Sequence, residues 1–116
     1  MALTKTATAL TWASGSSTAS GTTNAISTTG AYAATMYVKL ATGVGVTVAP
    51  TFYLQQSPDG STYFNGPTYA TPITASTSYY FMIALDPGCE SVQLVYTQET
   101  TGTSTLTGQL AQVTGV

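Results

Sequence analysis

The chain has 116 residues, a length that suits a single domain, and only 5% of them are charged, against about 25% in an ordinary soluble domain. It has two lysines, four acidic residues and neither histidine nor arginine, so its net charge is −2. These counts exclude nucleic acids and anionic membranes as partners, since both require several cations, and they exclude histidine-based catalytic sites and ordinary zinc sites. We therefore expect a protein that is not an enzyme and that holds no cofactor and no metal ion.

The N-terminal part of the chain differs from the rest. Residues 1–12 alternate weakly between apolar and polar positions, a pattern that indicates a weak strand. Residues 13–24 are rich in Ser, Thr and Gly, which is typical of a flexible loop or linker. We therefore predict an N-terminal arm over residues 1–24 and a folded β domain over residues 25–116.

A clear alternation opens the β domain. Apolar residues occupy every second position over 32–40 and continue in phase over 44–54, which predicts two strands. Pro50 has no amide hydrogen, so the second strand is predicted to be an edge strand or to bend there. Residues 57–60, Ser-Pro-Asp-Gly, predict a tight turn, after which 61–64 return as a partner strand.

The second half of the domain continues in the same way. Residues 79–85 are apolar on both faces, 86–88 predict a turn, 92–96 alternate again, and 106–113 predict a final strand. The whole chain thus holds about seven or eight short strands at spacings near 8 to 12 residues, and no segment has a helical period. We predict an all-β fold, an antiparallel β-sandwich that is jelly-roll or immunoglobulin-like.

The chain is apolar enough to bury a core, because 43% of its residues are hydrophobic and 10% are aromatic. The positions that share the period-two phase within each strand predict which residues form that core. They are Tyr32, Met36, Val38, Leu40, Val46, Phe52, Leu54, Phe81, Ile83, Leu85, Val92 and Leu94.

Three residues could carry chemistry, but each has a simpler interpretation. Cys89 has no neighbouring cation that would activate a thiolate, so we expect a partly buried thiol. Asp59 and Asp86 could pair as the acid and base of a glycosidase. Each, however, stands in a turn with Pro and Gly, where an aspartate caps the local backbone. The four acidic residues are also too scattered for a calcium site unless loops bring them together.

The aromatic residues are the candidates for contact with other molecules. Tyr37, Tyr53 and Tyr80 fall on the face opposite the apolar stripe of their strands, and Trp12 shares a face with Leu10 in the N-terminal arm. One interpretation is that they are ordinary surface or buried side chains. The other is that they form an interface, because Tyr and Trp offer large contact areas and lose few rotatable bonds on binding. A chain with so few charges has little electrostatic protection against association. These four residues are therefore the predicted interface of a homo-oligomer.

The segment Phe52–Phe64, FYLQQSPDGSTYF, resembles a hairpin that recurs in jelly-roll-like β domains. In that hairpin a strand turns through Asp-Gly and returns on an aromatic residue. Discoidin-like carbohydrate-binding domains have it, and so do small bacteriophage virion proteins, including head decoration (cement) proteins. The Thr/Ser/Gly-rich, charge-poor composition is more similar to that of the virion proteins.

The resemblance implies a structural virion protein that decorates and stabilises the outer capsid shell. Its partners would be the major capsid protein and further copies of itself, expected as a trimer. The chain has neither the apolar run of a secretory signal nor a run of about 20 apolar residues. We therefore expect no signal peptide and no transmembrane segment, with synthesis in the host cytoplasm and assembly into the virion. Two alternatives stay open: a phage tail or fibre component, and a carbohydrate-binding module with Trp12, Tyr53 and Tyr63 as stacking residues.

Overall fold

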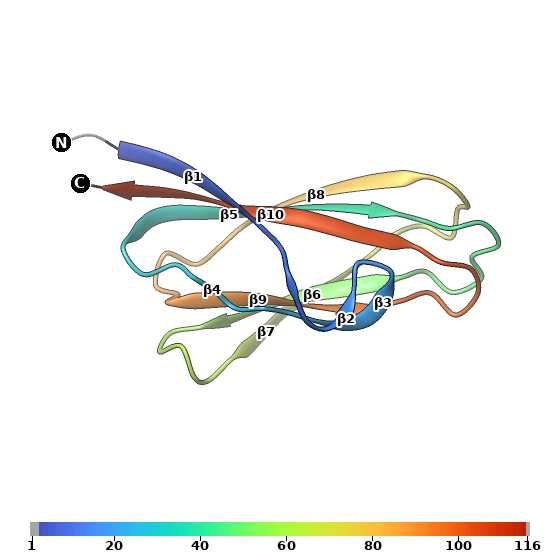
Figure 1. Ribbon diagram of the computed structural model, residues 1–116, viewed down its shortest axis with the longest axis horizontal. Helices are drawn as coiled ribbons and strands as arrows, with labels where there is room; N and C mark the ends of the chain where they lie inside the picture. The colour runs from blue at the N-terminus through green and yellow to red at the C-terminus, as the bar shows by residue number, and fades with distance from the viewer. Residues whose placement is uncertain (1–2, 116) are drawn as a thin grey trace.

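Two antiparallel sheets face each other in the computed structural model, which describes residues 3–115 (Figure 1). Within these residues every regular element is a strand. In chain order the strands are β1 (Leu3–Ala9), β2 (Trp12–Ser16), β3 (Ala19–Thr23), β4 (Ile26–Ser27), β5 (Ala31–Ala41), β6 (Thr51–Ser57), β7 (Phe64–Ala70), β8 (Ser78–Ala84), β9 (Ser91–Thr97) and β10 (Thr105–Gly115). No segment in this part of the chain forms a helix long and apolar enough to cross a membrane.

The strands pair in a nested order. β6 pairs with β7, β5 with β8, β3 and β4 with β9, and β1 with β10, and every pair is antiparallel. Successive pairs alternate between a six-stranded sheet, which runs β2-β3-β9-β6-β7 with β4 also on β9, and a four-stranded sheet, which runs β1-β10-β5-β8. The predicted antiparallel sandwich is confirmed, and this nested order is that of a jelly roll.

The core lies between the two sheets and follows the period of two that the strands show in sequence. Within β5, for example, Met36, Val38 and Leu40 are buried, while Tyr37 and Lys39 between them are exposed. Most of the predicted core is confirmed, and the partly buried Phe81 and Ile83 pack against it. The buried cluster consists of Met36, Val38, Leu40, Phe52, Leu54, Leu85, Val92, Leu94, Tyr96, Leu106 and Leu110.

Tyr32 is the wrong member of the predicted core, because its side chain is 61% exposed. It stands near the start of β5, and its ring lies against Gly115 at the far end of β10. The ends of β1 and β10 extend beyond the six-stranded sheet here (Figure 1). Ala33 is opposite Val113 but Ala31 is opposite Thr114, so Tyr32 is an extra residue in a β-bulge that interrupts the period of two.

Three segments differ from the elements that the sequence predicts. The strand that returns after the 57–60 turn is Phe64–Ala70 instead of residues 61–64. The run 44–54 is not one strand: residues 44–50 form a loop, and β6 begins directly after Pro50, whose missing N–H cannot join a sheet ladder. The predicted loop over 13–24 contains the β2–β3 hairpin instead. In that hairpin the backbones approach so closely that a Cβ on Gly15 or Gly21 would overlap the other strand.

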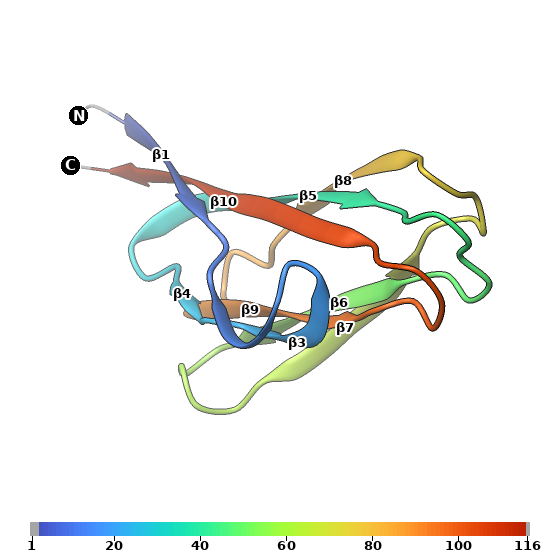
Figure 2. The same ribbon diagram turned by 45° about the vertical axis from the view of Figure 1, so that its right-hand side comes forward.

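The N-terminal strands belong to both sheets. β1 pairs along its whole length with β10 in the four-stranded sheet. The chain then crosses to the β2–β3 hairpin, in which β3 lies beside β9 (Figure 2). Trp12 at the start of β2 packs against Tyr96, with 6.1 Å between the ring centroids. Residues 3–23 are thus paired into the sandwich through backbone and side-chain contacts.

Candidate interaction surface

Three large side chains lie exposed on the outward face of the four-stranded sheet. Tyr37 comes from β5, and Tyr80 and Met82, which are 75% and 72% exposed, come from β8. Residues directly opposite one another in an antiparallel pair share a face of the sheet. Tyr37 is opposite Met82, and Lys39 is opposite Tyr80. The register between β5 and β8 therefore gathers these side chains into one group.

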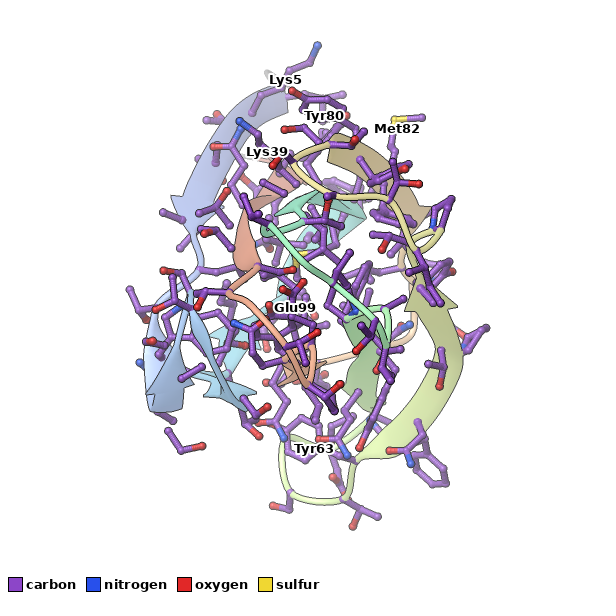
Figure 3. The ribbon with its side chains drawn as sticks, turned by 90° about the vertical axis from the view of Figure 1, so that its right-hand side faces the viewer. Lys5, Lys39, Tyr63, Tyr80, Met82 and Glu99 are labelled. Atoms are coloured by element: carbon purple, nitrogen blue, oxygen red, sulfur yellow. The ribbon has the colours of Figure 1, made fainter. Side chains whose placement is uncertain are left out.

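A shallow cleft of about 410 Å³ lies over this group, and Gln109 of β10 also lines it. Figure 3 shows Lys39, Tyr80 and Met82 on the same side of the molecule. We call Tyr37, Lys39, Tyr80 and Met82 the tyrosine face. Its large side chains stand on a sheet in which β10 and β8 pair with β5 on either side.

The charges are sorted between this face and the loops. Lys39 lies with its Nζ 5.9 Å from the centroid of the Tyr80 ring, within reach of a cation–π interaction. Lys5 projects from the same face of the sheet, as the pairing of β1 with β10 and of β10 with β5 places it (Figure 3). The acidic residues lie elsewhere: Asp59 and the segment 86–90 in loops, and Glu99 buried. Both lysines of the chain thus stand on one face, without an acidic residue among them.

The sequence could not show that Met82 belongs to this face. The run 79–85 is apolar on both faces in sequence, and in the structure only the side with Phe81 and Ile83 packs on the core. β8 is the last strand of its sheet, and nothing in residues 3–115 covers its outward side. A run without polar residues does not reveal which of its two faces will be left open.

The four predicted interface residues do not lie together. Tyr37 and Tyr80 share the tyrosine face. Trp12 is half-buried against Tyr96, and both residues belong to the six-stranded sheet. Tyr53 is half-buried in β6, where Thr68 and Val95 lie beside it in the neighbouring strands. The structure therefore brings two of the four into one surface.

The residues considered for sugar stacking are also separate. Trp12 and Tyr53 lie as described above, and Tyr63 stands in the β6–β7 turn, where its hydroxyl is 3.0 Å from Ser91 Oγ. Figure 3 shows Tyr63 on the side of the molecule away from Tyr80. Within residues 3–115 no ring contact joins these three side chains, so they form no common stacking platform.

Asp59 organises the turn after β6. Its Oδ1 accepts hydrogen bonds from the backbone N–H groups of Thr62 and Ser61, both at 2.8 Å, and from the Ser57 hydroxyl at 3.0 Å. These donors, Thr62 and Ser61 first, stabilise the ionised carboxylate and lower the pKa of Asp59 below its ordinary value. The geometry is that of the aspartate cap expected from the sequence.

Asp86 and Cys89 lie at the same end of the sandwich, beside a cleft of about 490 Å³. Asp86 Oδ1 accepts a hydrogen bond of 2.7 Å from the Gly88 N–H, which closes its own turn. The half-buried Cys89 thiol lies 3.3 Å from the Thr28 hydroxyl. In the described part of the chain, no group of three or more His, Cys, Asp or Glu side chains is placed to hold a metal ion.

Glu99 is a buried carboxylate that sequence analysis did not single out. Its Oε2 accepts hydrogen bonds from the Ser104 hydroxyl and, at 3.4 Å, from the Gly43 N–H, while its Oε1 has no partner. Burial, and secondarily the nearby Glu99 carboxylate, raise the pKa of Tyr96. The Tyr96 hydroxyl does not bond to Glu99. It donates to Gln98 Oε1 and to the Ser104 carbonyl. This polar cluster ties the β9–β10 loop to the start of the β5–β6 loop.

Comparisons with protein-family models, with curated proteins and with solved structures gave no match to this chain.

Proposed function

We propose that the protein is a non-enzymatic structural component of a bacteriophage virion, a decoration protein that binds the outer capsid shell and also associates with itself. The observation that supports this proposal is the tyrosine face: large exposed side chains on a rigid sheet, in a chain with few charges. The jelly roll is also an architecture found among viral capsid domains.

The chemistry of the tyrosine face suits a protein partner. Exposed aromatic and methionine side chains contribute strongly when an interface removes them from water. A contiguous apolar patch on a small domain indicates an interaction site. Because the formal charges on this face are those of Lys5 and Lys39, the complementary surface of the partner is neutral or acidic.

Co-sedimentation tests this role directly. Purified protein is mixed with shells assembled from the major capsid protein of the same phage, and the bound fraction is measured after pelleting. We expect binding by the unaltered protein and a loss of at least about tenfold in affinity for the double variant Tyr80→Ser, Met82→Ser, since each side chain has the size of an interface anchor.

Ile73→Ser is the matched control, because Ile73 is also a large exposed apolar residue but lies in the β7–β8 loop. It should bind as the unaltered protein does. Failure of the unaltered protein to bind shells would contradict the decoration role. Binding to purified tails instead would assign the protein to the tail or fibre.

The proposal includes the absence of catalysis. Hydrolase screens with ester, peptide and glycoside substrates should stay at background, because histidine is missing and Asp59 and Asp86 cap their own turns. Turnover that Asp59→Asn or Asp86→Asn specifically abolishes would contradict this.

A further inference from the structure

β1 is an edge strand, and within residues 3–115 no other strand pairs with its outer side. It forms one side of the four-stranded sheet, its neighbour in the sheet is β10, and all seven of its side chains are exposed. The sequence from Leu3 to Ala9 alternates Thr with Leu, Lys or Ala, so it offers neither a proline nor a bulge that would block another strand. Lys5 is the single charged residue in this edge. Long unguarded edges of this kind are templates for pairing with another strand.

The register shows which backbone groups of β1 are unpaired. Ala9 is opposite Gln109, and in the same register the Leu10 N–H donates to the Gly108 carbonyl at 3.0 Å. Backbone N–H and C=O groups of successive strand residues point to opposite sides. The even-numbered residues therefore bond to β10, and Lys5 and Ala7, with the other odd-numbered residues, direct their N–H and C=O groups outward.

We propose that two copies of this chain pair antiparallel through their β1 edges, with Thr6 at the two-fold axis. In this arrangement Lys5 lies opposite Ala7 of the partner subunit, and the two four-stranded sheets continue as one. The occupant of the edge is a second copy because the edge is complementary to itself. The outward-pointing groups of each β1 meet the outward-pointing groups of the other.

Charge and length select this register. Thr6 is the midpoint of β1, so centring on it pairs the strand over its full length from Leu3 to Ala9. Centring on Lys5 would shorten the overlap and place the two lysines directly opposite each other, which is unfavourable. A shift by one residue would set outward-pointing backbone groups against inward-pointing ones and leave no hydrogen bonds between the copies.

The pairing would also join the two tyrosine faces. Lys5 and the tyrosine face lie on the same side of the sheet (Figure 3), so a continuous sheet presents both copies of the face on one surface. This inference gives a contact to the self-association in the proposed function, but it does not depend on capsid binding. One strand edge is a small interface, so we expect a dimer that dissociates on dilution.

Cysteine crosslinking tests the register. In a Cys89→Ser background, Thr6→Cys should form a covalent dimer under mild oxidation, because residues opposite each other at a non-hydrogen-bonded position have Cα atoms about 4.5 Å apart, within disulfide range. Ala7→Cys is the matched control. It is equally exposed, but the two copies of residue 7 would lie about 7 to 8 Å apart on the diagonal, too far for a disulfide. Equal crosslinking of the two variants would overturn the proposal.

A second variant tests the edge without cysteine. Ala7→Pro removes an N–H that points outward, so β1 should keep its pairing with β10 while the dimer is lost. Light scattering across a concentration series should then show a monomer, with an unchanged far-ultraviolet circular dichroism spectrum. An unaltered protein that is monomeric at every concentration, or an Ala7→Pro variant that still dimerises, would contradict self-pairing.

The capsid experiment separates this inference from the proposed function. A dimer that crosslinks through Thr6→Cys but does not bind shells would refute the decoration role alone. A monomer whose shell binding is lost in Ala7→Pro would assign the edge to the capsid protein and overturn pairing between copies.

Discussion

Gly102 allows the buried Glu99 carboxylate to fit beneath the β9–β10 loop. Its φ of 79° lies in the left-handed region, which glycine adopts without strain. A Cβ at this position would also overlap the Val44 carbonyl oxygen and Glu99 Oε1. The polar cluster around Glu99 and Ser104 therefore depends on the missing side chain at residue 102.

Gly102 and Gly45 have the same backbone conformation but different surroundings. Gly45 also has a φ of 79°, but a Cβ there would meet nothing within 4 Å. Gly45→Ala should destabilise the protein by about 1 to 2 kcal/mol, the cost of the left-handed conformation alone. Gly102→Ala should cost clearly more, because steric overlap is added. Chemical denaturation measures both variants, and equal losses would show that residue 102 is not tightly enclosed.

Asp59 gives the stability of the protein a dependence on pH. Its pKa is lowered in the folded state, so the ionised carboxylate contributes stability that is complete above the ordinary value near 4 and is lost as pH falls through the folded value. Asp59→Asn should therefore be less stable than the unaltered protein at neutral pH, and the difference should shrink as the pH falls below the ordinary value near 4. Thermal melts across a pH series measure this. A difference that does not change with pH would contradict the role of the charge.

At the scale of the strands, β6 is an interior strand of its sheet with no exposed residue. It lies between β9 and β7, and Phe52 and Leu54 face the core. Leu54→Ala should cost about 2 to 5 kcal/mol, because it removes buried methyl groups and leaves a cavity. Ile73→Ala changes an exposed aliphatic residue and should stay within about 0.5 kcal/mol. Urea titrations of both variants are the measurement, and similar costs would show that the assigned face of β6 is wrong.

The strands that the sequence predicts best are those with one solvent-exposed face and one buried face. β5 is correct in position and, apart from Tyr32, in phase, because Tyr37 and Lys39 alternate with buried apolar residues. β8 is correct in position, and Phe81 and Ile83 pack against the core as predicted. The exposure of Met82 could not be predicted, because the outward residues of β8 are as apolar as its inward ones. The β2–β3 hairpin could not be predicted, because its sequence is rich in Ser, Thr and Gly and has no clear hydrophobic alternation. Its pairing depends on the close approach of the two backbones at Gly15 and Gly21.

The tyrosine face could be predicted only in part. The phase of each strand places Tyr37 and Tyr80 on outward positions, but the register that sets Tyr37 beside Met82 is a property of the sheet and not of either strand. Trp12 and Tyr53 have similar sequence signals and lie elsewhere. The sequence could therefore identify candidate residues, while the surface that some of them share came from long-range pairing.

At the scale of the whole molecule, the small number of charged residues predicts that association depends little on salt concentration. Contacts made by Tyr, Met, Thr and backbone groups are not screened as ion pairs are. Self-association and shell binding should therefore change little between low salt and about 1 M salt, where the screening length is roughly 3 Å. Light scattering and co-sedimentation at the two salt concentrations measure this. A large loss of association at high salt would show that Lys5 and Lys39 dominate the contacts.

The nested pairing also sets an order for folding. β6 and β7 are joined by the short segment 58–63, whereas Leu3 and Gly115 pair across nearly the whole chain. Because closing a longer loop costs more entropy and distant contacts form slowly, we expect the roll to close outward from β6–β7, with β1 docking last. Native-state hydrogen exchange should accordingly find the β1 amides among the first to open. The strand that we propose to join two copies, β1, would thus be the last to dock in its own subunit. At high protein concentration, pairing of β1 with another chain would therefore compete with the final step of folding.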